Sequence, residues 1–499
     1  MKIALVAIGR RENRYAREWV EHYLELGFDH IYICDNNHDG EEYFEDVLGD
    51  RIAEHKVSIH DYRNRQGVQV VAYNEMYRLY GGQYDWMAFF DFDEFLTVNS
   101  VMTVKQWLAF YTGTDADTVL VNWKCYGDCG QVYDDGRGVK ERFTEPLPLD
   151  KAVQYDFPNN NHIKSIVRGG LGEISFGRNP HIPDTARCCY TATWQPCEAS
   201  PFQPYDFNVA TLHHYATKTI EEWMMNKWTK GTGNKPDMDA FRKKYKGRFF
   251  KYNEATPEKQ AYMEAFERNK EQRITVCIVH YNTPEMTRCC IRSLQKHTPG
   301  VGIIVFDNSD KRPFEPMDGV EIIDNTKGQI INFDEWLKEF PDKVDVGNGW
   351  ASAKHCWTVQ WLVNKRRNPF ILMDSDVLIK QDISSFWDKT QAFVGQVKPH
   401  MSAFRITVER VLPFLCFVNV PMMKEEGVNY FNFPKMWALT YKSPDKAYDT
   451  GCWFLEDVRR HGLPRRELSI DPYALHFGHG SWKGKDPKEW LEEHKALWA

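Results

Sequence analysis

The chain has 499 residues, of which 42% are hydrophobic and 27% charged, and its formal net charge is −7. This length and composition are typical of a soluble globular protein with two or more domains, and they exclude a disordered or fibrous chain. Nucleic-acid binding requires a basic face, so a mildly acidic chain predicts no nucleic-acid partner.

The apolar runs are too short for a membrane-spanning helix, which needs about 18 residues or more. The longest, 411–423, is interrupted by Pro413, Asn419 and Pro421. We interpret it as a buried strand, with the lining of an acceptor site as the alternative. The N-terminal run, 3–8, is too brief for a signal peptide. We therefore expect a cytoplasmic protein whose 12 cysteines are free thiols.

The first half of the chain predicts alternating strands and helices. In chain order these are a strand over 2–8, a helix over 15–26 that ends at Gly27, a strand over 31–35 that ends in Asp35 and Asn36, and a strand over 85–90 that leads into Asp91 and Asp93, with His213 and His214 far downstream.

The second half repeats this series. Its elements are a strand over 274–279, a helix over 285–297, a strand over 303–307 that ends in Asp307 and Asn308, and a strand over 369–373 that leads into Asp374 and Asp376, with His476 and His479 far downstream. The aspartate of the second strand follows the start of the first by 33 residues in both halves, from Lys2 to Asp35 and from Ile274 to Asp307. Such agreement predicts an internal repeat.

The repeat predicts an α/β fold with two tandem domains, 1–265 and 272–499. A stretch rich in Glu, Lys and Ala, 254–271, predicts a helical connector between them. Strands that alternate with helices form mostly parallel sheets, and such sheets bind ligands at the carboxyl ends of their strands.

Paired aspartates at a strand end are typical of a metal site. Two carboxylates this close repel unless a cation intervenes, and hard oxygen ligands select Mg²⁺ or Mn²⁺. The sequence contains four such pairs, but those at 115/117 and 237/239 follow no strand and predict surface loops. We interpret Asp91/Asp93 and Asp374/Asp376 as metal ligands that leave positions open for phosphate oxygens. The alternative is a helix cap or a loop acid.

The late histidines complete this interpretation. Neutral imidazole is a common metal ligand, and His214 and His476 fall at the same place in the repeat, so we predict both as third ligands. His479 is an open alternative to His476. Lys218 follows His214 by four residues, within reach of a donor phosphate if the loop turns back.

The acids at the second strand ends predict nucleotide contacts. Asp35 and Asp307, each followed by an asparagine, can accept a hydrogen bond from a ribose hydroxyl or a base N–H. The alternative is a turn, which Asp-Asn sequences favour.

Several stretches of the first half occur in a specific combination, which spans nearly all of the first 225 residues: Glu18-Trp19 with His22 and Gly27, Asp85 to Met87 leading into Asp91 to Phe95, Trp123 to Gly127, Glu141 to Phe143, Lys164 to Val167, and His214 to Lys218 followed by Glu222 and Trp223. With them the half resembles the family 92-like group of GT-A glycosyltransferases. The resemblance implies donor contacts from Asp35, Asn36, Lys164 and Lys218.

The second half resembles glycosyltransferase family 2, through His280 to Asn282, Asp307 to Ser309, Asn348 to Trp350, Asp374 to Asp376, Asp449 to Gly451 and His476 to Trp482. The resemblance implies donor contacts from Tyr281, Asp307, Asn308 and Asn348. The Glu-Asp pair usual in that family is absent. Asp449 stands nearest to its place, and Glu456-Asp457 is the alternative.

These resemblances imply transfer of a sugar from a UDP-linked donor to an acceptor hydroxyl, with inversion at the anomeric carbon. A metal ion would neutralise the departing diphosphate, and a carboxylate would accept the hydroxyl proton. We expect Asp449 in this role in the second half. For the first half Glu141, Glu173 and Asp184 are candidates, and we name Glu173, which lies in a glycine-rich stretch.

A basic and aromatic stretch, 241–252, has two interpretations. It could rest on an anionic membrane surface or meet a lipid-linked acceptor, which would make the protein peripheral at the inner face of the membrane. The favoured interpretation is a solvated helix face with its aromatic side chains packed inward.

Three alternatives to a bifunctional transferase remain. A sugar nucleotidylyltransferase would need a Gly-rich, Arg-containing loop after the first strand, which both halves lack. A sugar-binding protein would not need two metal motifs. One catalytic domain could be joined to a non-catalytic domain that binds the sugar or acceptor, but both halves retain the aspartates and the histidine. Two sites predict successive additions to a growing polysaccharide or oligosaccharide.

Overall fold

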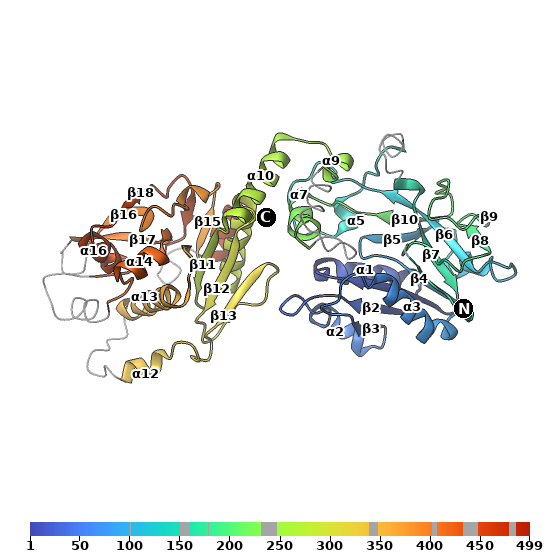
Figure 1. Cartoon of the computed structure of the whole chain (residues 1–499), viewed down its shortest axis with the longest axis horizontal. Helices are drawn as coiled ribbons and strands as arrows, with labels where there is room; N and C mark the ends of the chain where they lie inside the picture. Colours follow the sequence, from blue (N-terminus) through green and yellow to red (C-terminus); the bar gives the residue numbers. More distant parts are fainter. Residues whose placement is uncertain are drawn as a thin grey trace. The chain divides into compact units, whose positions relative to one another are not determined.

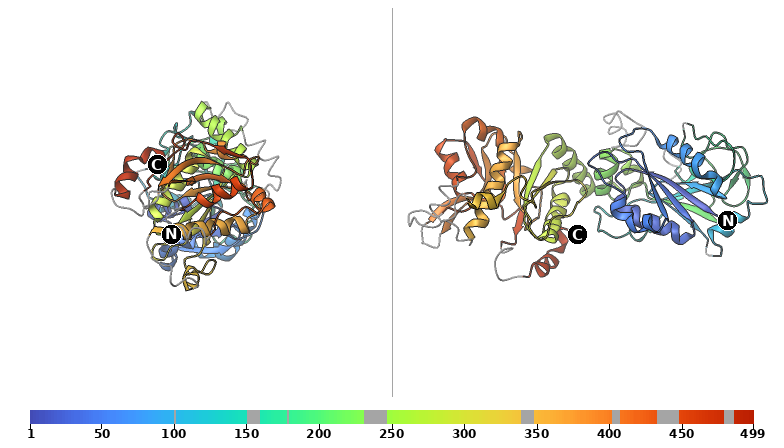
Figure 2. Two further views of the ribbon diagram at one scale, coloured as in Figure 1. Left: turned by 90° about the vertical axis from the view of Figure 1, so that its left-hand side faces the viewer. Right: turned by 90° about the horizontal axis from the view of Figure 1, so that it is seen from below.

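The computed structural model describes residues 1–99, 101–149, 159–177, 179–230, 247–338, 348–401, 407–432, 448–478 and 486–499. The chain divides into two compact units, Met1–Gln260 and Ala261–Ala499 (Figure 1). Each unit is a mixed sheet with helices packed against it (Figure 2). None of the described helices is long and apolar enough to cross a membrane.

The sheet of the first unit has the order β3-β2-β1-β4-β7-β6-β10-β5. Its first four strands are parallel, and β7 then pairs antiparallel with both β4 and β6. The strands are β1 (Ile3–Gly9), β2 (His30–Asp35), β3 (Val57–Asp61), β4 (Trp86–Phe89), β5 (Glu94–Val98), β6 (Thr118–Cys125), β7 (Ile163–Arg168), β8 (Cys189–Thr191), β9 (Pro196–Cys197) and β10 (Ala210–His214).

Helices cover both faces of this sheet. Successive side chains of β1 point to opposite faces, and each face packs against a different helix. Leu5 belongs to the apolar cluster that contains Trp19 of α1, whereas Val6 belongs to the cluster that contains Met76 of α3. The helical elements are α1 (Asn13–Leu26), α2 (Glu45–Ala53), α3 (Gln69–Tyr80), α4 (Val104–Ala109), α5 (Val139–Arg142), α7 (Ile220–Glu222), the π-helix Trp223–Trp228, α9 (Phe249–Tyr252) and the 3₁₀ turns Gly81–Gln83 and Asn159–Asn161.

The predicted end of the first helix is confirmed. Gly27 has a φ of 108°, a conformation that glycine adopts without strain, and its N–H bonds to the carbonyl of Leu24 at 3.1 Å. The N–H of Phe28 bonds to the carbonyl of Tyr23 at 3.0 Å. This cap turns the chain directly into β2.

The second unit repeats the plan, with the sheet order β13-β12-β11-β14-β17-β16-β18 and a separate pair β15-β19. Its first four strands are again parallel, and β17 pairs antiparallel with β14. The strands are β11 (Thr275–His280), β12 (Gly302–Asp307), β13 (Val320–Asp324), β14 (Phe370–Asp374), β15 (Val377–Ile379), β16 (Phe393–Met401), β17 (Thr407–Val418), β18 (Arg465–Glu467) and β19 (Ala474–His476).

Helices again pack on both faces. Ile278 lies in a cluster with Leu294 of α11, and Cys277 lies in a cluster with Val359 of α13. The helical elements of this part are α10 (Pro257–Gln272), α11 (Pro284–His297), α12 (Phe333–Lys338), α13 (Asn348–Lys365), α14 (Val420–Glu426), α16 (Cys452–Arg460), α17 (Pro487–Glu493) and the 3₁₀ turns Ser384–Phe386 and Lys495–Leu497.

The predicted α/β class, with two mostly parallel sheets and a helical connector, is confirmed, and α10 is the connector. The run 411–423 is a strand only in part. It belongs to β17 up to Val418, and α14 begins at Val420, where Asn419 caps the helix and Pro421 occupies its first turn.

Candidate active sites

The acid motif of the first unit lies in the turn between β4 and β5. Asp91 is held by three donors: Gln69 Nε2 at 2.9 Å, Tyr73 Oη at 3.2 Å and Lys164 Nζ at 2.7 Å. Gln69 and Tyr73 are one turn apart on α3, so the start of this helix presents both to the end of β4. Lys164 comes from β7, the strand next to β4.

Asp93 points to a different set of partners. Its Oδ2 lies 2.5 Å from Lys227 Nζ, and its Oδ1 lies 3.7 Å from His214 Nε2. Glu94, the next residue, is fully buried and accepts hydrogen bonds from Trp123 Nε1 and the Asp91 N–H, each at 2.8 Å. The motif is thus a cluster of three carboxylates rather than two.

The sheet register brings His214 to this cluster, because His214 of β10 lies directly across from Glu94 of β5. Ligand atoms of Asp93, Glu94 and His214 all lie within 4.8 Å of one another, which suits a metal ion. The predicted ligand set contained Asp91 instead of Glu94. Asp91 is turned toward Lys164, and Glu94 takes its place in the group.

Burial and charge set the protonation of these groups. Burial raises the pKa of Glu94 well above its usual range, opposed by Lys164 and reinforced by Asp91 and Asp93. Burial would also raise the pKa of Asp93, but Lys227 and His214 hold it well below its usual value. Burial lowers the pKa of His214, which favours the neutral imidazole that binds metals.

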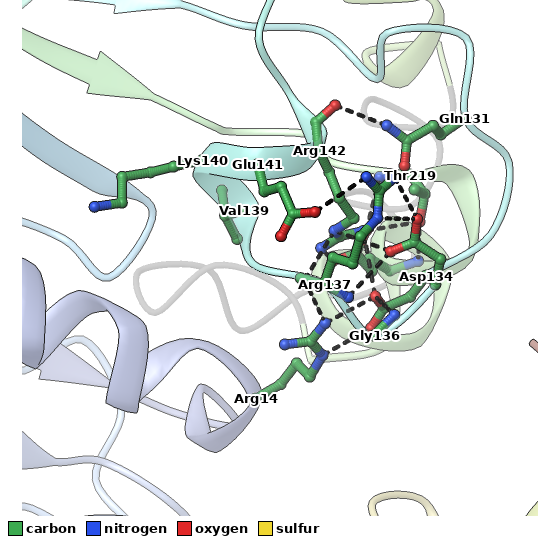
Figure 3. Close-up of polar contacts among 12 residues, drawn as sticks. Arg14, Gln131, Asp134, Gly136, Arg137, Val139, Lys140, Glu141, Arg142 and Thr219 are labelled. Atoms are coloured by element: carbon green, nitrogen blue, oxygen red, sulfur yellow. Dashed lines mark hydrogen bonds and ion pairs between the residues drawn. The ribbon is translucent and has the colours of Figure 1, made fainter.

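A buried ion network anchors the segment that follows His214 (Figure 3). Arg142 of α5 binds Glu222 of α7 through two hydrogen bonds, of 2.8 and 3.0 Å. Arg14 and Arg142 both reach Asp134, at 2.8 and 3.3 Å. Glu222 also accepts from Thr219 in a capping box, so the network fixes the turn that carries Lys218.

Lys218 is buried against Tyr15, with its Nζ 4.2 Å from the centre of that ring. Its φ is 53°, which is unusual for a residue with a side chain. Burial lowers the pKa of Lys218, although Asp93 and Glu12 oppose the shift. Asp93 thus acts electrostatically on Lys218, and the contact of Lys218 with a donor phosphate stays a prediction.

The second unit repeats this arrangement with histidines. Asp374 ends β14 and its Oδ1 lies 3.0 Å from His355 Nε2, while Asp376 Oδ1 lies 3.2 Å from His476 Nε2. His476 of β19 is directly across from Val377 of β15, and its ring stacks on Phe414 with centroids 4.0 Å apart. The ligand atoms of Asp374, Asp376 and His476 lie within 4.8 Å of one another, as the predicted set requires.

The pKa of Asp374 is lowered and the pKa of His476 is raised. Burial would raise the pKa of Asp374, but His355 and His476 lower it. Burial opposes the charge on His476, but its hydrogen bond to Asp376 raises the pKa of this imidazole.

Asp449 lies just before α16, and its carboxylate contacts side chains of α13 and β17. Ser352 Oγ donates to its Oδ1 at 2.7 Å, and Arg410 forms an ion pair with its Oδ2. Ser352 and His355 are one turn apart on α13, so a single helix contacts both Asp449 and Asp374. Arg410 also contributes to the low pKa of Asp374.

The alternatives to Asp449 serve other contacts. Asp457 is fully buried and accepts the Asn429 N–H at 2.8 Å, and Glu456 accepts a hydrogen bond from Tyr448. Both therefore hold the local structure around α16.

The acids at the second strand ends are engaged within the protein. Asp35 accepts from Asn37 and from Arg63, at 2.7 and 2.6 Å. Asp307 accepts the N–H groups of Ser309 and Phe314, at 2.8 and 2.7 Å. The two asparagines that follow them also make internal bonds: Asn36 to the carbonyls of Tyr62 and Arg65, and Asn308 to Thr358 and Asn325.

Tyr281 and Asn348 are the two other predicted donor contacts of the second unit, and the structure describes the side chain of Tyr281. Tyr281 follows β11 with 45% of its surface exposed, and its Oη donates to Asp310 at 3.1 Å. Lys354 Nζ lies 4.7 Å from the centre of the Tyr281 ring. The side chain of Asn348 lies outside the described residues, as do His479 and the acid pair 237/239.

The three candidates for the general base of the first unit lie in two regions, on α5 and after β7. Glu141 is exposed on α5 beside Arg137, at 3.3 Å (Figure 3). Glu173 is exposed in the loop after β7, three residues before Phe176, which packs on Tyr73 with centroids 5.5 Å apart. The carboxylate of Asp184 packs against the backbone of Gly177 in the same region.

Two residues that contact the acid motifs were missed in the sequence. His355 lies on α13 three residues after Ser352, a helical spacing that gives a weak signal. Lys227 lies on a π-helix, whose wider turn no sequence pattern indicates. Of the stretch 241–252, residues 241–246 lie outside the described residues, and Phe249 and Tyr252 of α9 are buried.

Comparison with known families supports the resemblance of the first half. Residues 11–169 match the family model described as Glycosyltransferase family 92. This segment contains Asp91 and Asp93 and extends to the end of β7, which carries Lys164. The chain is therefore a glycosyltransferase, and the family 2 resemblance of its second half stays a prediction.

No curated protein matches the sequence. Solved structures match at low identity. They include the galactosyltransferase LgtC in complex with donor and acceptor sugar analogues (11% identity, TM-score 0.30, covering 45% of this chain and 95% of that one), S. aureus TarS 1–349 in complex with UDP-GlcNAc (13%, 0.26, 52% and 78%), and the glycosyltransferase GlyE of Streptococcus pneumoniae (13%, 0.25, 44% and 59%).

Proposed function

We propose that the chain is a bifunctional, inverting glycosyltransferase whose two units, corresponding to the predicted domains 1–265 and 272–499, each use a UDP-sugar donor and Mn²⁺ or Mg²⁺. One repeated relationship carries this proposal. In each unit the residue that follows the second aspartate pairs across two antiparallel strands with the late histidine: Glu94 with His214, and Val377 with His476. Both units thus bring two carboxylates and one imidazole together at the end of the fourth parallel strand.

The carboxylates and the imidazole of each unit fit a hard divalent cation. Asp93, Glu94 and His214 would hold it in the first unit, with Asp91 close by, and Asp374, Asp376 and His476 in the second. Carboxylate oxygens with one imidazole suit Mn²⁺ or Mg²⁺. When bound, the ion would supply charge neutralisation for the departing diphosphate.

In the second unit Asp449 acts as the general base. Ser352 and Arg410 orient its carboxylate, and α13 links it to Asp374 through Ser352 and His355. Asp449 accepts the proton of the acceptor hydroxyl as that oxygen bonds to the anomeric carbon. The bond between this carbon and the diphosphate oxygen breaks on the opposite face, and UDP leaves with the electron pair.

In the first unit we assign the base to Glu173. The observation behind this choice is its loop, which packs through Phe176 on Tyr73, a partner of Asp91. Glu173 is exposed, so an acceptor hydroxyl can reach it.

The donor contacts follow the same division. Lys164 and Lys218 provide positive charge beside the acid motif of the first unit. In the second unit, the exposed ring of Tyr281 can stack on the nucleobase of the donor, and Asn348 would lie beside the donor. For Asp35, Asn36, Asp307 and Asn308 we propose that ligand binding exchanges some of their internal hydrogen bonds for bonds to the nucleoside.

The acceptor is a growing polysaccharide or oligosaccharide, or a saccharide linked to a lipid. In the last case the stretch 241–252 would contact the cytoplasmic face of a membrane. The alternative hypothesis for the function is that one unit is catalytic and the other binds the sugar or the acceptor without catalysis. The family match favours it, because that match covers residues 11–169 of the first unit.

Hydrolysis of a panel of UDP-sugars, with Mn²⁺, with Mg²⁺ and with EDTA, tests the proposal. We expect UDP release from at least one donor, only when the metal is present. If no UDP-sugar is consumed under any condition, the assignment of UDP as the donor nucleotide is wrong.

A further inference from the structure

The two acid motifs differ in the cations that face them. In the first unit each aspartate has its own lysine, Lys164 on Asp91 at 2.7 Å and Lys227 on Asp93 at 2.5 Å. In the second unit the ion-pair partners of Asp374 and Asp376, within the part of the chain that the structure describes, are the imidazoles of His355 and His476.

The two lysines of the first unit differ in their freedom to move. Lys164 is fully buried and lies between Asp91 and Glu94, with Nζ 3.7 Å from Glu94. Lys227 retains 26% of its side-chain exposure. A lysine ammonium on a flexible, partly exposed stem can change partners without unfolding its surroundings. Lys227 can therefore leave Asp93, whereas Lys164 cannot.

The π-helix that carries Lys227 points it at the predicted donor site. Asn226 Nδ2 donates to the carbonyl of Arg11 at 3.1 Å, and Lys230 Nζ lies 2.7 Å from Glu12 Oε1. Arg11 and Glu12 lie just after β1, which ends at Gly9 and whose carboxyl end borders the acid motif at the end of β4. π-Helical turns are rare and are frequently found at functional sites.

Lys227 and a divalent cation would compete for the same oxygen atoms. Asp93 is a member of the group that could hold a metal ion, and Lys227 already neutralises it. An ammonium displaced from Asp93 would remain beside the site, and the nearest new anion would be the diphosphate of the donor. Lysine is a common phosphate-binding residue.

We propose that Lys227 is a two-position cation: it neutralises Asp93 while the donor site of the first unit is empty, and it binds the donor diphosphate once a divalent cation takes Asp93. This inference rests on the proposed function of the first unit. It couples metal binding to donor binding there. Among the described residues of the second unit, the acid motif faces imidazoles, so no lysine there would compete with the metal in this way.

Mn²⁺ titration followed by electron paramagnetic resonance tests this role without relying on turnover. The full chain is used with Asp374→Asn and Asp376→Asn, so that the first unit is the remaining candidate Mn²⁺ site. In this background Lys227→Met should bind Mn²⁺ about five to ten times more tightly in the absence of UDP, because the competing ammonium is gone. Adding UDP should tighten Mn²⁺ binding in the parent but much less in Lys227→Met.

Two control variants separate this role from a structural one. Lys227→Arg keeps the charge and should behave like the parent. Lys105→Met removes a partly exposed lysine of the first unit that pairs with Asp29 outside the acid motif, and should leave Mn²⁺ affinity unchanged. Equal or weaker Mn²⁺ binding by Lys227→Met would overturn the inference alone. Absence of Mn²⁺ binding in both the parent and Lys227→Met would overturn the metal site of the first unit as well.

Discussion

His476 lies directly across from Val377 in the strand pair β15–β19, and this places its Nε2 3.2 Å from Asp376. The first unit has the same relationship between His214 and Glu94, one residue after Asp93. In both units the N–H of the residue after the histidine also bonds to the carbonyl of the second aspartate, at 2.8 and 2.9 Å. The repeat thus extends to single hydrogen bonds.

Asp449→Asn should abolish the activity of the second unit without affecting UDP binding. The amide of asparagine has nearly the same shape as the carboxylate, so Ser352 can still donate to Oδ1. The amide cannot accept the proton of the acceptor hydroxyl. We expect kcat to fall about 10²- to 10⁴-fold, measured with a donor specific to that unit. Glu456→Gln is the matched control and should retain activity. If Asp449→Asn lost UDP affinity, Asp449 would be a donor-binding residue instead.

Gly451→Ala should disrupt the turn that positions Asp449. A Cβ on Gly451 would lie 2.0 Å from the carbonyl oxygen of Val411, at a φ of 81°. We expect the second unit to lose about 2 kcal/mol or more of unfolding free energy, from the clash and the backbone strain together.

Gly427→Ala is the comparison for this change. Gly427 ends α14 at a φ of 70°, but its added Cβ would meet nothing within 4 Å. Urea unfolding should therefore show a loss of only about 1 kcal/mol, from backbone strain alone. Equal losses in the two variants would mean that the Val411 contact is unimportant.

Arg142→Met should destabilise the first unit strongly. It would leave the buried carboxylate of Glu222 without its bidentate partner, at a cost of about 3–5 kcal/mol in chemical unfolding. The double variant Arg142→Met/Glu222→Gln should recover part of this loss because no buried charge is left unpaired. Arg137→Met removes an exposed arginine of the same region and should cost less than about 1 kcal/mol. No recovery in the double variant would contradict this explanation.

The first unit should lose stability as the pH falls from about 6.5 toward 4. Burial lowers the pKa of both His22 and His213 to about 4. In this window the unfolded chain binds protons that the folded unit does not, so the unfolding free energy decreases with decreasing pH. Each histidine contributes about 2–3 kcal/mol at most.

Urea titrations at pH 7.5, 6 and 5 measure this effect. His22 bonds through Nε2 to the carbonyl of Leu96 and through Nδ1 to Lys140, which fits the neutral ring. His22→Gln should flatten the dependence, whereas Val101→Thr, at an exposed position of the same unit with no titratable side chain, should not. An identical slope in all three proteins would show that other groups cause it.

Much of the fold was predictable because its signals are local. The apolar strands, the glycine cap at Gly27 and the two acid motifs each depend on a few neighbouring residues. The interval of 33 residues from the first strand to the aspartate of the second, which is the same in both halves, indicated two similar units. The late histidines were predicted from the repeat, and the strand register explains why they reach the aspartates.

The unpredicted parts depend on long-range geometry. The choice between Asp91 and Glu94 depends on Lys164, which is 73 residues from Asp91 and approaches it only through the pairing of β4 with β7. Lys227 reaches Asp93 through a π-helix, for which no periodicity exists in the sequence. His355 contacts Asp374 because α13 packs beside β14, which its sequence alone does not indicate.

The central claim, that both units transfer sugars, is tested most directly by the UDP-sugar panel on two variants. Asp91→Asn/Asp93→Asn and Asp374→Asn/Asp376→Asn each remove the acid motif of one unit while retaining its shape. With Mn²⁺ present, we predict that each variant loses activity toward a different donor and retains the activity of the other unit. If one variant has full activity on every donor that the wild type consumes, the unit altered in it is not catalytic, and the bifunctional account is wrong.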